Sequence, residues 1–401
     1  MKRSGSADLP LHYGHVPPWL ATRMALLGSA IVDTLLLEYG KDEVIRRLGD
    51  PFWFQSLGAV MGMDWHSSGI TTSVMGALKK AVNPRSAELG IYICGGKGRF
   101  SRQTPDELMK IGSRTGLDAD YLVRCSKLAA KVDNTAVQDG FQLYLHNFIV
   151  ADTGNWCVVQ QGMSDQSSTA RRYHWHSREL VSFVEEPHTF IYGRNRGLIL
   201  NMTDKGAAAS RDALMMMTKE SPERMLHEIR HLKMPGRHDV RQKDVDMKRL
   251  GTILWLAHDK QPADFGELML LQGLGPRTLQ SLALVSEVIY GTPSRFTDPA
   301  RFSFAHGGKD GHPFPVPTKV YDEAISVLRT AVDRSRLGND DKRQAVKSLS
   351  KIARDAEKDF VADGNLQDWI EKERKDAWKY GGKTVFGDAR PPVNRQLDLF
   401  D

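Results

Sequence analysis

Cysteine is scarce in this chain of 401 residues, with only Cys94, Cys125 and Cys157 present. The three lie far apart and none forms a Cys-x-x-Cys pair, so neither a disulfide framework nor a zinc ribbon is expected. We expect three reduced, partly buried thiols.

A leader and a membrane-spanning run are also lacking. The first residues, MKRSGSADLPLHYGH, contain no apolar core of a signal peptide, and no apolar run approaches the length of a membrane span. These absences predict a cytoplasmic protein with no membrane partner.

An excess of one charge is nearly absent. The formal net charge is +6, from 55 Lys and Arg against 49 Asp and Glu, and the sequence pI is about 9.0. This balance is compatible with a polyanionic partner but does not by itself identify one. The hydrophobic share of 41% is sufficient for real cores.

Secondary-structure patterns predict an α+β fold. Residues 1–82 are mostly helical, with apolar positions at helical spacing from Leu20 to Tyr39 and a stop at Gly40. Between about 86 and 200, short β-branched and aromatic segments predict a small mixed or antiparallel sheet, with a hairpin turn at 152–155. The chain is helical again from about 210.

These patterns divide the chain into four parts. We expect an N-terminal α/β domain over 1–205, a helical domain over 206–338, a charged helical extension over 339–384 and a flexible tail over 385–401. Asp50 before Pro51 is typical of a helix cap, and Thr104 with Glu107 has the spacing of a capping box. The run PFWFQ at 51–55 is expected in the core.

The stretch FGELMLLQGLGPRTLQSLALVSEVIYG is the most informative interior segment. It predicts two helices joined by Gly273-Leu274-Gly275-Pro276, and it resembles the helix-hairpin-helix motif of DNA glycosylases and other repair proteins. Glycines permit close approach to a phosphate, and the second helix presents free N–H groups to it. We therefore expect Gly273, Gly275, Arg277 and Thr278 to bind DNA; the alternative is a plain packing turn.

The chemistry of the glycosylases does not transfer with this motif. Where those enzymes can have a catalytic Lys, this chain has Arg277, a poor Schiff-base nucleophile. Asp298 lies a few residues later than the motif expects, and Asp298-Pro299 is more typical of a helix cap.

Acidic residues in the first half indicate a possible metal site. Asp64 and His66 flank a Trp, and Lys131, Asp133 and Asp139 precede a strand. Carboxylates hold a hard cation that activates water for phosphodiester hydrolysis, and a Lys can neutralise developing charge. We expect Asp64, Asp133 and Asp139 as ligands of Mg²⁺ or Mn²⁺, with Lys131 and His66 assisting. Each acid could instead be a cap or a surface pair.

Basic residues beside glycines or aromatics extend the predicted DNA surface. Lys97 lies in CGGKGRFSR and Lys309 in FAHGGKDGHPFPVP, while Arg171 and Arg172 precede Tyr173 in ARRYHWHS. Such residues approach phosphates or stack on bases. Ordinary surface turns, and histidines on a strand face at 174 and 176, are the alternatives.

Six long segments give a family resemblance over most of residues 3–330: RSGSADLPLHYG, PFWFQSLGAVMGMDWHSSGITT, GGKGRFSR, AKVDNTAVQDGFQLY, VVQQGM and AHGGKDGHPFPV. With them the chain resembles the uncharacterised family called domain of unknown function 763. The resemblance implies a shared fold with a helix-hairpin-helix element, and it supplies no catalytic residues.

The tail ends in a motif with a distinct partner. The pentapeptide made by Gln396, Leu397, Asp398, Leu399 and Phe400 resembles the bacterial sliding-clamp-binding peptide at every position. In such peptides the Leu and Phe enter an apolar pocket of the clamp. Pro391-Pro392 prevents a continuing helix and keeps the peptide accessible. The alternative is that these residues fold back on the protein.

Together these features predict a DNA repair or DNA-processing protein that is recruited to the sliding clamp in the bacterial nucleoid. A metal-dependent endonuclease acting on damaged or structured DNA is the favoured reaction. A base-excision glycosylase with Asp298 as its acid, and a non-catalytic DNA-binding adaptor, remain open.

Overall fold

The structure is a computed structural model, and it forms two compact units, residues 1–356 and 357–401. It describes residues 9–10, 16–63, 68–164, 166–231, 247–300, 318–334, 340, 342, 344–347, 383–384 and 387–388. The first unit is α+β, as predicted from the sequence, and the second is described only as the short pair β7 (Lys383–Thr384) and β8 (Gly387–Asp388).

Four helices open the first unit and end where the sequence indicates. They are α1 (Pro18–Tyr39), α2 (Lys41–Gly49), α3 (Pro51–Val60) and α4 (Gly69–Val82). Gly40 ends α1 with φ of 82°, a conformation that favours glycine. Asp50 caps α3 by accepting hydrogen bonds from the amides of Phe52 and Trp53, each at 2.8 Å. The PFWFQ run is in the core, as expected.

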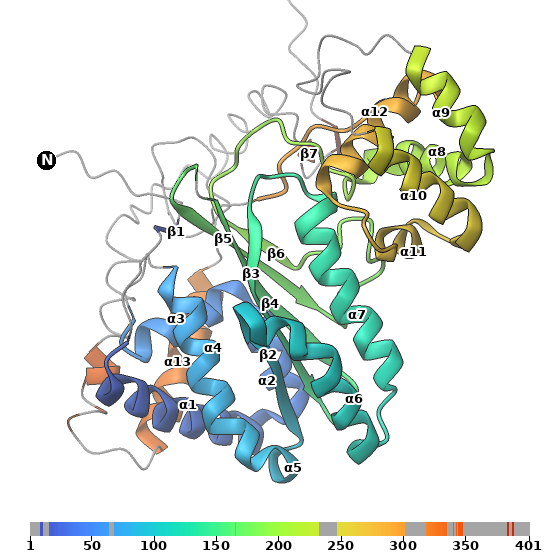
Figure 1. The fold of residues 1–401 in the computed structure, drawn as a ribbon. Coiled ribbons are helices and arrows are strands. Elements are labelled where there is room, and N and C mark those ends of the chain that lie inside the picture. Colours follow the sequence, from blue (N-terminus) through green and yellow to red (C-terminus); the bar gives the residue numbers. More distant parts are fainter. Residues whose placement is uncertain are drawn as a thin grey trace, which may run out of the picture. The chain divides into compact units, whose positions relative to one another are not determined.

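An antiparallel sheet of six strands forms the centre of the first unit (Figure 1). Its order is β1-β5-β4-β3-β2, and β6 pairs with β5. The strands are β1 (Leu9–Pro10), β2 (Ile91–Lys97), β3 (Gln142–Ala151), β4 (Trp156–Ser164), β5 (Thr169–His176) and β6 (Phe190–Tyr192). The turn predicted at 152–155 joins β3 to β4, with the amide of Gly154 donating to the carbonyl of Ala151.

Helices cover both faces of this sheet, so most strand residues are buried whichever way they point (Figure 1). One core joins α1–α4 to Ile93, Ile149 and Val159. The other joins the opposite face, with Phe148 and Val158, to α6 (Thr104–Thr115), α7 (Ala119–Lys131) and the later helices. A sheet covered on both sides loses the simple alternation of apolar and polar residues.

The later helices form a group next to α7 (Figure 1). They are α8 (Ala208–Lys219), α9 (Pro222–His231), α10 (Met247–Lys260), α11 (Phe265–Leu270) and α12 (Pro276–Tyr290). The last helix, α13 (Thr318–Arg334), is different, because its Leu328 and Val332 belong to the core formed by α1–α4.

The predicted capping box at Thr104 is wrong. Thr104 lies inside the first turn of α6, where its hydroxyl donates to the carbonyl of Ser101. Glu107 instead forms an ion pair with Lys79 at 2.7 Å and accepts from the amide of Gly95 at 2.5 Å. A lysine on a neighbouring helix has outcompeted the helix's own N-terminus for this carboxylate.

The expectation that no run has the length of a membrane span is also wrong. Among the described residues, α1 is long and apolar enough to cross a membrane, which is a test that core helices also pass. Its Ile31, Val32 and Leu35 are buried in the core with α4 and α13. We therefore treat α1 as a core helix.

Candidate functional site

Asp133, a predicted metal ligand, lies in a buried network of hydrogen bonds. It lies on a turn of π-helix at 132–136, directly after α7, and its side chain is fully buried. Its Oδ2 accepts from the Trp175 indole N–H at 3.0 Å and from the Gln160 amide, and its Oδ1 is bonded to His188 Nε2. Both oxygens are thus occupied by protein donors.

The network continues from Gln160 to a histidine and a serine. Gln160 Oε1 can only accept, so the His146 Nδ1 at 2.7 Å carries a proton. Burial lowers the pKa of His146 and keeps the ring neutral, so its Nε2 accepts from the Ser126 hydroxyl at 2.8 Å. Hydroxyl and imidazole have the order of a nucleophile and its base, but Ser126 is only 3% exposed. The arrangement therefore stabilises the interface of α7 and the sheet.

Asp139, a second predicted ligand, forms a buried ion pair with Arg171. The Arg171 Nη1 lies 2.9 Å from Asp139 Oδ2, and the guanidinium also holds Asp298 through two contacts of 3.0 and 2.8 Å. All three charged side chains have no exposed surface. Burial opposes the charge on Arg171, but the two carboxylates outweigh it and raise the pKa of the guanidinium. Asp298 is thus an ion-pair partner of a strand arginine, and its Oδ1 also accepts from the amide of Ala300 at 2.8 Å, as a capping side chain does. The residues in which a helix would continue, 301–317, lie outside the described residues.

The structure does not bring Asp133 and Asp139, the two described members of the predicted metal site, together around one position. Asp133 and Asp139 belong to separate networks, and each has its oxygens engaged by protein donors. Within the described ranges no group of three His, Cys, Asp or Glu residues could hold a metal ion. The other two members of the predicted site, Asp64 and His66, lie outside the described residues. The described part of the site does not fit a divalent cation.

Arg172, predicted to contact DNA, is enclosed on the opposite face of the sheet. Its guanidinium lies 4.9 Å from the Phe54 ring centre and 5.1 Å from that of Tyr192. It donates to Gln55 Oε1 and to His174 Nε2, each at 2.9 Å. Burial lowers the pKa of Arg172 to about 10. Neither Arg171 nor Arg172 has exposed surface, so neither can meet a phosphate without rearrangement.

The two helices predicted around Gly273 and Gly275 do form, as α11 and α12, and the turn that joins them is called the hairpin below. Gly273 adopts φ of 87°, Leu274 is buried between the helices and Gly275 precedes the first turn of α12 in an extended conformation. Gly275 has no side chain to cap α12, so the helix begins with uncapped amides. Arg277 is exposed on the first turn, whereas Thr278 is buried.

Side chains from elsewhere fix the hairpin in place. Lys131 Nζ donates to the carbonyl of Leu274 at 2.5 Å, and Gln138 Nε2 donates to that of Pro276 at 2.7 Å. Burial lowers the pKa of Lys131, and the charge of Arg249 lowers it further. Lys131, predicted to be catalytic, therefore lies at the hairpin.

Sequence patterns do not indicate one basic residue that lies at the hairpin, Arg249. The Arg249 Nη2 lies 3.7 Å from the position that a Cβ at Gly275 would take, and Arg249 is exposed. Arg249 belongs to α10, and no local pattern links that helix to a turn 26 residues later.

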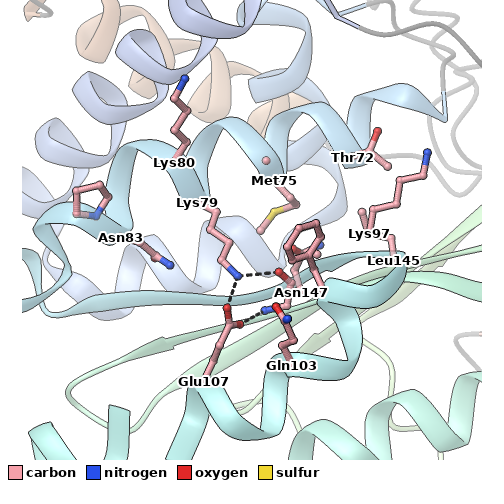
Figure 2. A pocket seen from close by; sticks show the side chains of 15 residues that line it. Thr72, Met75, Lys79, Lys80, Asn83, Lys97, Gln103, Glu107, Leu145 and Asn147 are labelled. Atoms are coloured by element: carbon pink, nitrogen blue, oxygen red, sulfur yellow. Dashed lines mark hydrogen bonds and ion pairs between the residues drawn. The ribbon is translucent and has the colours of Figure 1, made fainter. Parts of the chain in front are cut away.

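A second site is an open cavity of about 650 Å³ between α4, β2 and the 3-10 turn 98–103 (Figure 2). Lys97, a predicted DNA contact, lies at its edge and is exposed. Figure 2 shows Lys79 reaching from α4 to Glu107, while Lys80 and Lys97 point away from that pair. Lys309, the other predicted loop lysine, lies outside the described residues.

The fold and these sites define an α+β protein that combines the α11–α12 hairpin with an antiparallel sheet covered by helices on both faces. Residues 5–316 match the family described as "Protein of unknown function (DUF763)", so the chain belongs to that family, as its motifs indicated. Neither the curated proteins nor the solved structures contain a match to this chain.

Proposed function

We propose that this protein binds the phosphodiester backbone of DNA through the α11–α12 hairpin and acts in DNA repair or processing at the sliding clamp. The observation that carries the proposal is the uncapped N-terminus of α12, with exposed Arg277 and Arg249 next to it. Free amides and the positive end of a helix dipole favour an anion at that place.

The surroundings of the hairpin support a charged rather than an apolar partner. Gly273 and Gly275 expose backbone without a Cβ, so a phosphate can approach their amides closely. Lys131 and Gln138 are bonded to carbonyls on the inner side of the turn, which fixes its conformation before any ligand arrives. A pre-ordered turn loses less entropy on binding.

Substitution of Gly275 by Asp is expected to affect folding and binding in opposite directions. The backbone of Gly275 is extended, with φ of −124°, and the space for a Cβ is open. The carboxylate would cap α12 and add up to about 1 kcal/mol to the free energy of unfolding. It would also occupy the amides and repel phosphate, so affinity for a labelled 20-base-pair duplex should fall more than about tenfold.

The Gly275→Asn variant is the matched control. Asn has the same shape as Asp and can cap the helix, but it adds no charge. Affinity at 0.1 M salt should decrease in the order Gly, Asn, Asp, whereas the midpoint of urea unfolding should not decrease. Equal duplex affinity of all three proteins would contradict the proposal, since an anion at the site would then have no effect.

Recruitment to the bacterial sliding clamp is proposed from residues 396–400, which lie outside the described residues. Two apolar anchors on a short accessible peptide suit a pocket on a partner. Leu399→Ala with Phe400→Ala should weaken binding to immobilised clamp at least about 100-fold, if each anchor contributes roughly 1.5–3 kcal/mol. Asp398→Ser, which keeps the motif, is the control. Unchanged binding by the double variant would exclude this peptide as the contact.

The reaction is proposed from the sequence as metal-dependent strand cleavage, and it now depends on Asp64 and His66. A glycosylase gains no support, because Asp298 is occupied by Arg171. A DNA-binding adaptor needs only the hairpin and the tail. Strand cleavage by the purified protein decides between the endonuclease and the adaptor.

A further inference from the structure

The cavity between α4, β2 and the 98–103 turn has the lining of a nucleotide site. Its volume of about 650 Å³ is within the range of small-ligand pockets, roughly 300–1,000 Å³. Met75 and Leu145 supply apolar wall, and Asn147 and Gln103 supply amides. We propose that this cavity takes one unpaired nucleotide of the bound DNA strand, an inference that rests on the proposed function.

Glycines shape the cavity at its strand edge. Gly95 has φ of 84°, and a Cβ there would overlap the carbonyl oxygen of His146 and the Thr104 hydroxyl. Gly96 has φ of 140° and lies against Phe100. Gly95 is thus required by internal packing, whereas the half-buried Gly96 leaves backbone without a side chain next to an aromatic ring.

Phe100 provides a surface on which a base can stack. It is 47% exposed although it is a large apolar residue, and it lines the cavity. The guanidinium of Arg99 lies 5.1 Å from its ring centre. An exposed aromatic with a cation beside it is typical of sites that bind single-stranded nucleic acid.

The charge at the cavity is positive. Lys79 is neutralised by Glu107, at 2.7 Å. Lys80 and Lys97 are exposed, and among the described residues neither has an ion-pair partner within 4.0 Å. Lys97 lies 5.9 Å from the Tyr144 ring centre, which restricts its position at the edge of the cavity. Figure 2 shows Lys80 pointing away from the cavity, so the ammonium group of Lys97 is the one that suits a phosphate next to the nucleotide.

Asn147 gives the cavity a polar group that can contact a base. It is 1% exposed, and its amide nitrogen donates weakly to the Val159 carbonyl at 3.4 Å. An amide side chain can accept from and donate to a base edge at the same time.

The test compares Lys97→Ala/Phe100→Ala with the matched control Met109→Ala/Lys110→Ala. Met109 is 46% exposed and Lys110 is exposed, both on α6 and away from the lining residues. Binding is measured for a labelled single strand, a duplex with one bulged nucleotide and a fully paired duplex. Free deoxynucleoside monophosphate is added as a competitor in a separate arm. Thermal melting checks that each variant folds.

The first variant should bind the single strand and the bulged duplex about tenfold or more weakly, because stacking contributes roughly 1–3 kcal/mol per base. The fully paired duplex should be affected no more than in the control. The competitor arm distinguishes the source of the nucleotide. If monophosphate displaces the strand from wild-type protein but not from the Lys97→Ala/Phe100→Ala variant, the cavity is a nucleotide site that takes free nucleotides.

Equal binding of every DNA by the two double variants would overturn this inference. The proposed function would survive that result if Gly275→Asp still lost duplex binding. A wild-type protein that binds neither DNA nor monophosphate would overturn both.

Discussion

Arg171→Met should lower the free energy of unfolding by about 3–5 kcal/mol at pH 7.5, the usual cost of breaking a buried ion pair on one side. The substitution keeps the apolar stem but leaves Asp139 and Asp298 buried without their cation. Urea unfolding followed by tryptophan fluorescence measures the loss. It should be one of the largest effects of any single substitution described for this chain.

The pH dependence of the stability loss in Arg171→Met shows whether the buried carboxylates cause it. Burial already raises the pKa of Asp139 above its ordinary value, and loss of the Arg171 charge, which lowers it, would raise it further. The folded variant then takes up protons before the unfolded chain does. Its deficit relative to wild type should therefore shrink as the pH falls from 7.5 toward 5.

Arg171→Lys is the control, since it keeps the charge but not the forked contacts. A Met variant as stable as wild type, or a deficit that does not change with pH, would show that the three side chains do not form the ion pair seen here. The prediction matters for function, because Arg171 joins β5 to the segment that follows the hairpin helix α12. A DNA-binding defect in an Arg171 variant would then arise from folding.

The sequence predicted most of the helices because their ends have local signals. Gly40 ends α1 and Asp50 caps α3, and both depend on a single residue and its neighbours. The hairpin was predictable for the same reason, since Gly273 and Gly275 are required by the turn itself. Glu107 shows the limit, because its partner Lys79 is on another helix.

The candidate site was less predictable, because periodicity does not show which polar strand residues are covered. In β5, Arg171, Tyr173 and Trp175 point to one face and Arg172 and His174 to the other. Helices bury both faces, so residues that read as a nucleic-acid surface are ion-pair and aromatic partners inside the protein. Likewise, the spacing of Asp133 and Asp139 does not show that each is bonded by a different set of donors.

Because Asp133 belongs to a buried network, a substitution there cannot by itself test strand cleavage. An Asp133→Ala protein would leave the donors of Gln160, Trp175 and His188 without their acceptor, at a cost of about 1–3 kcal/mol for each buried group left unpaired. Its loss of activity would not distinguish a metal ligand from a folding defect. Asp64 is the predicted ligand that lies outside the described residues.

We expect wild-type protein to cut labelled duplexes carrying uracil, abasic sites, mismatches or flaps in Mg²⁺ or Mn²⁺ and not in EDTA. Asp64→Asn should reduce that rate by about 100-fold or more, as removal of a group that stabilises transition-state charge does. The activity of Asp133→Asn should instead follow its folded fraction, measured by thermal melting. Full activity of Asp64→Asn would remove the last predicted ligand. No cleavage of any substrate by wild type, with duplex binding retained, would make the chain an adaptor that brings other proteins to DNA at the clamp.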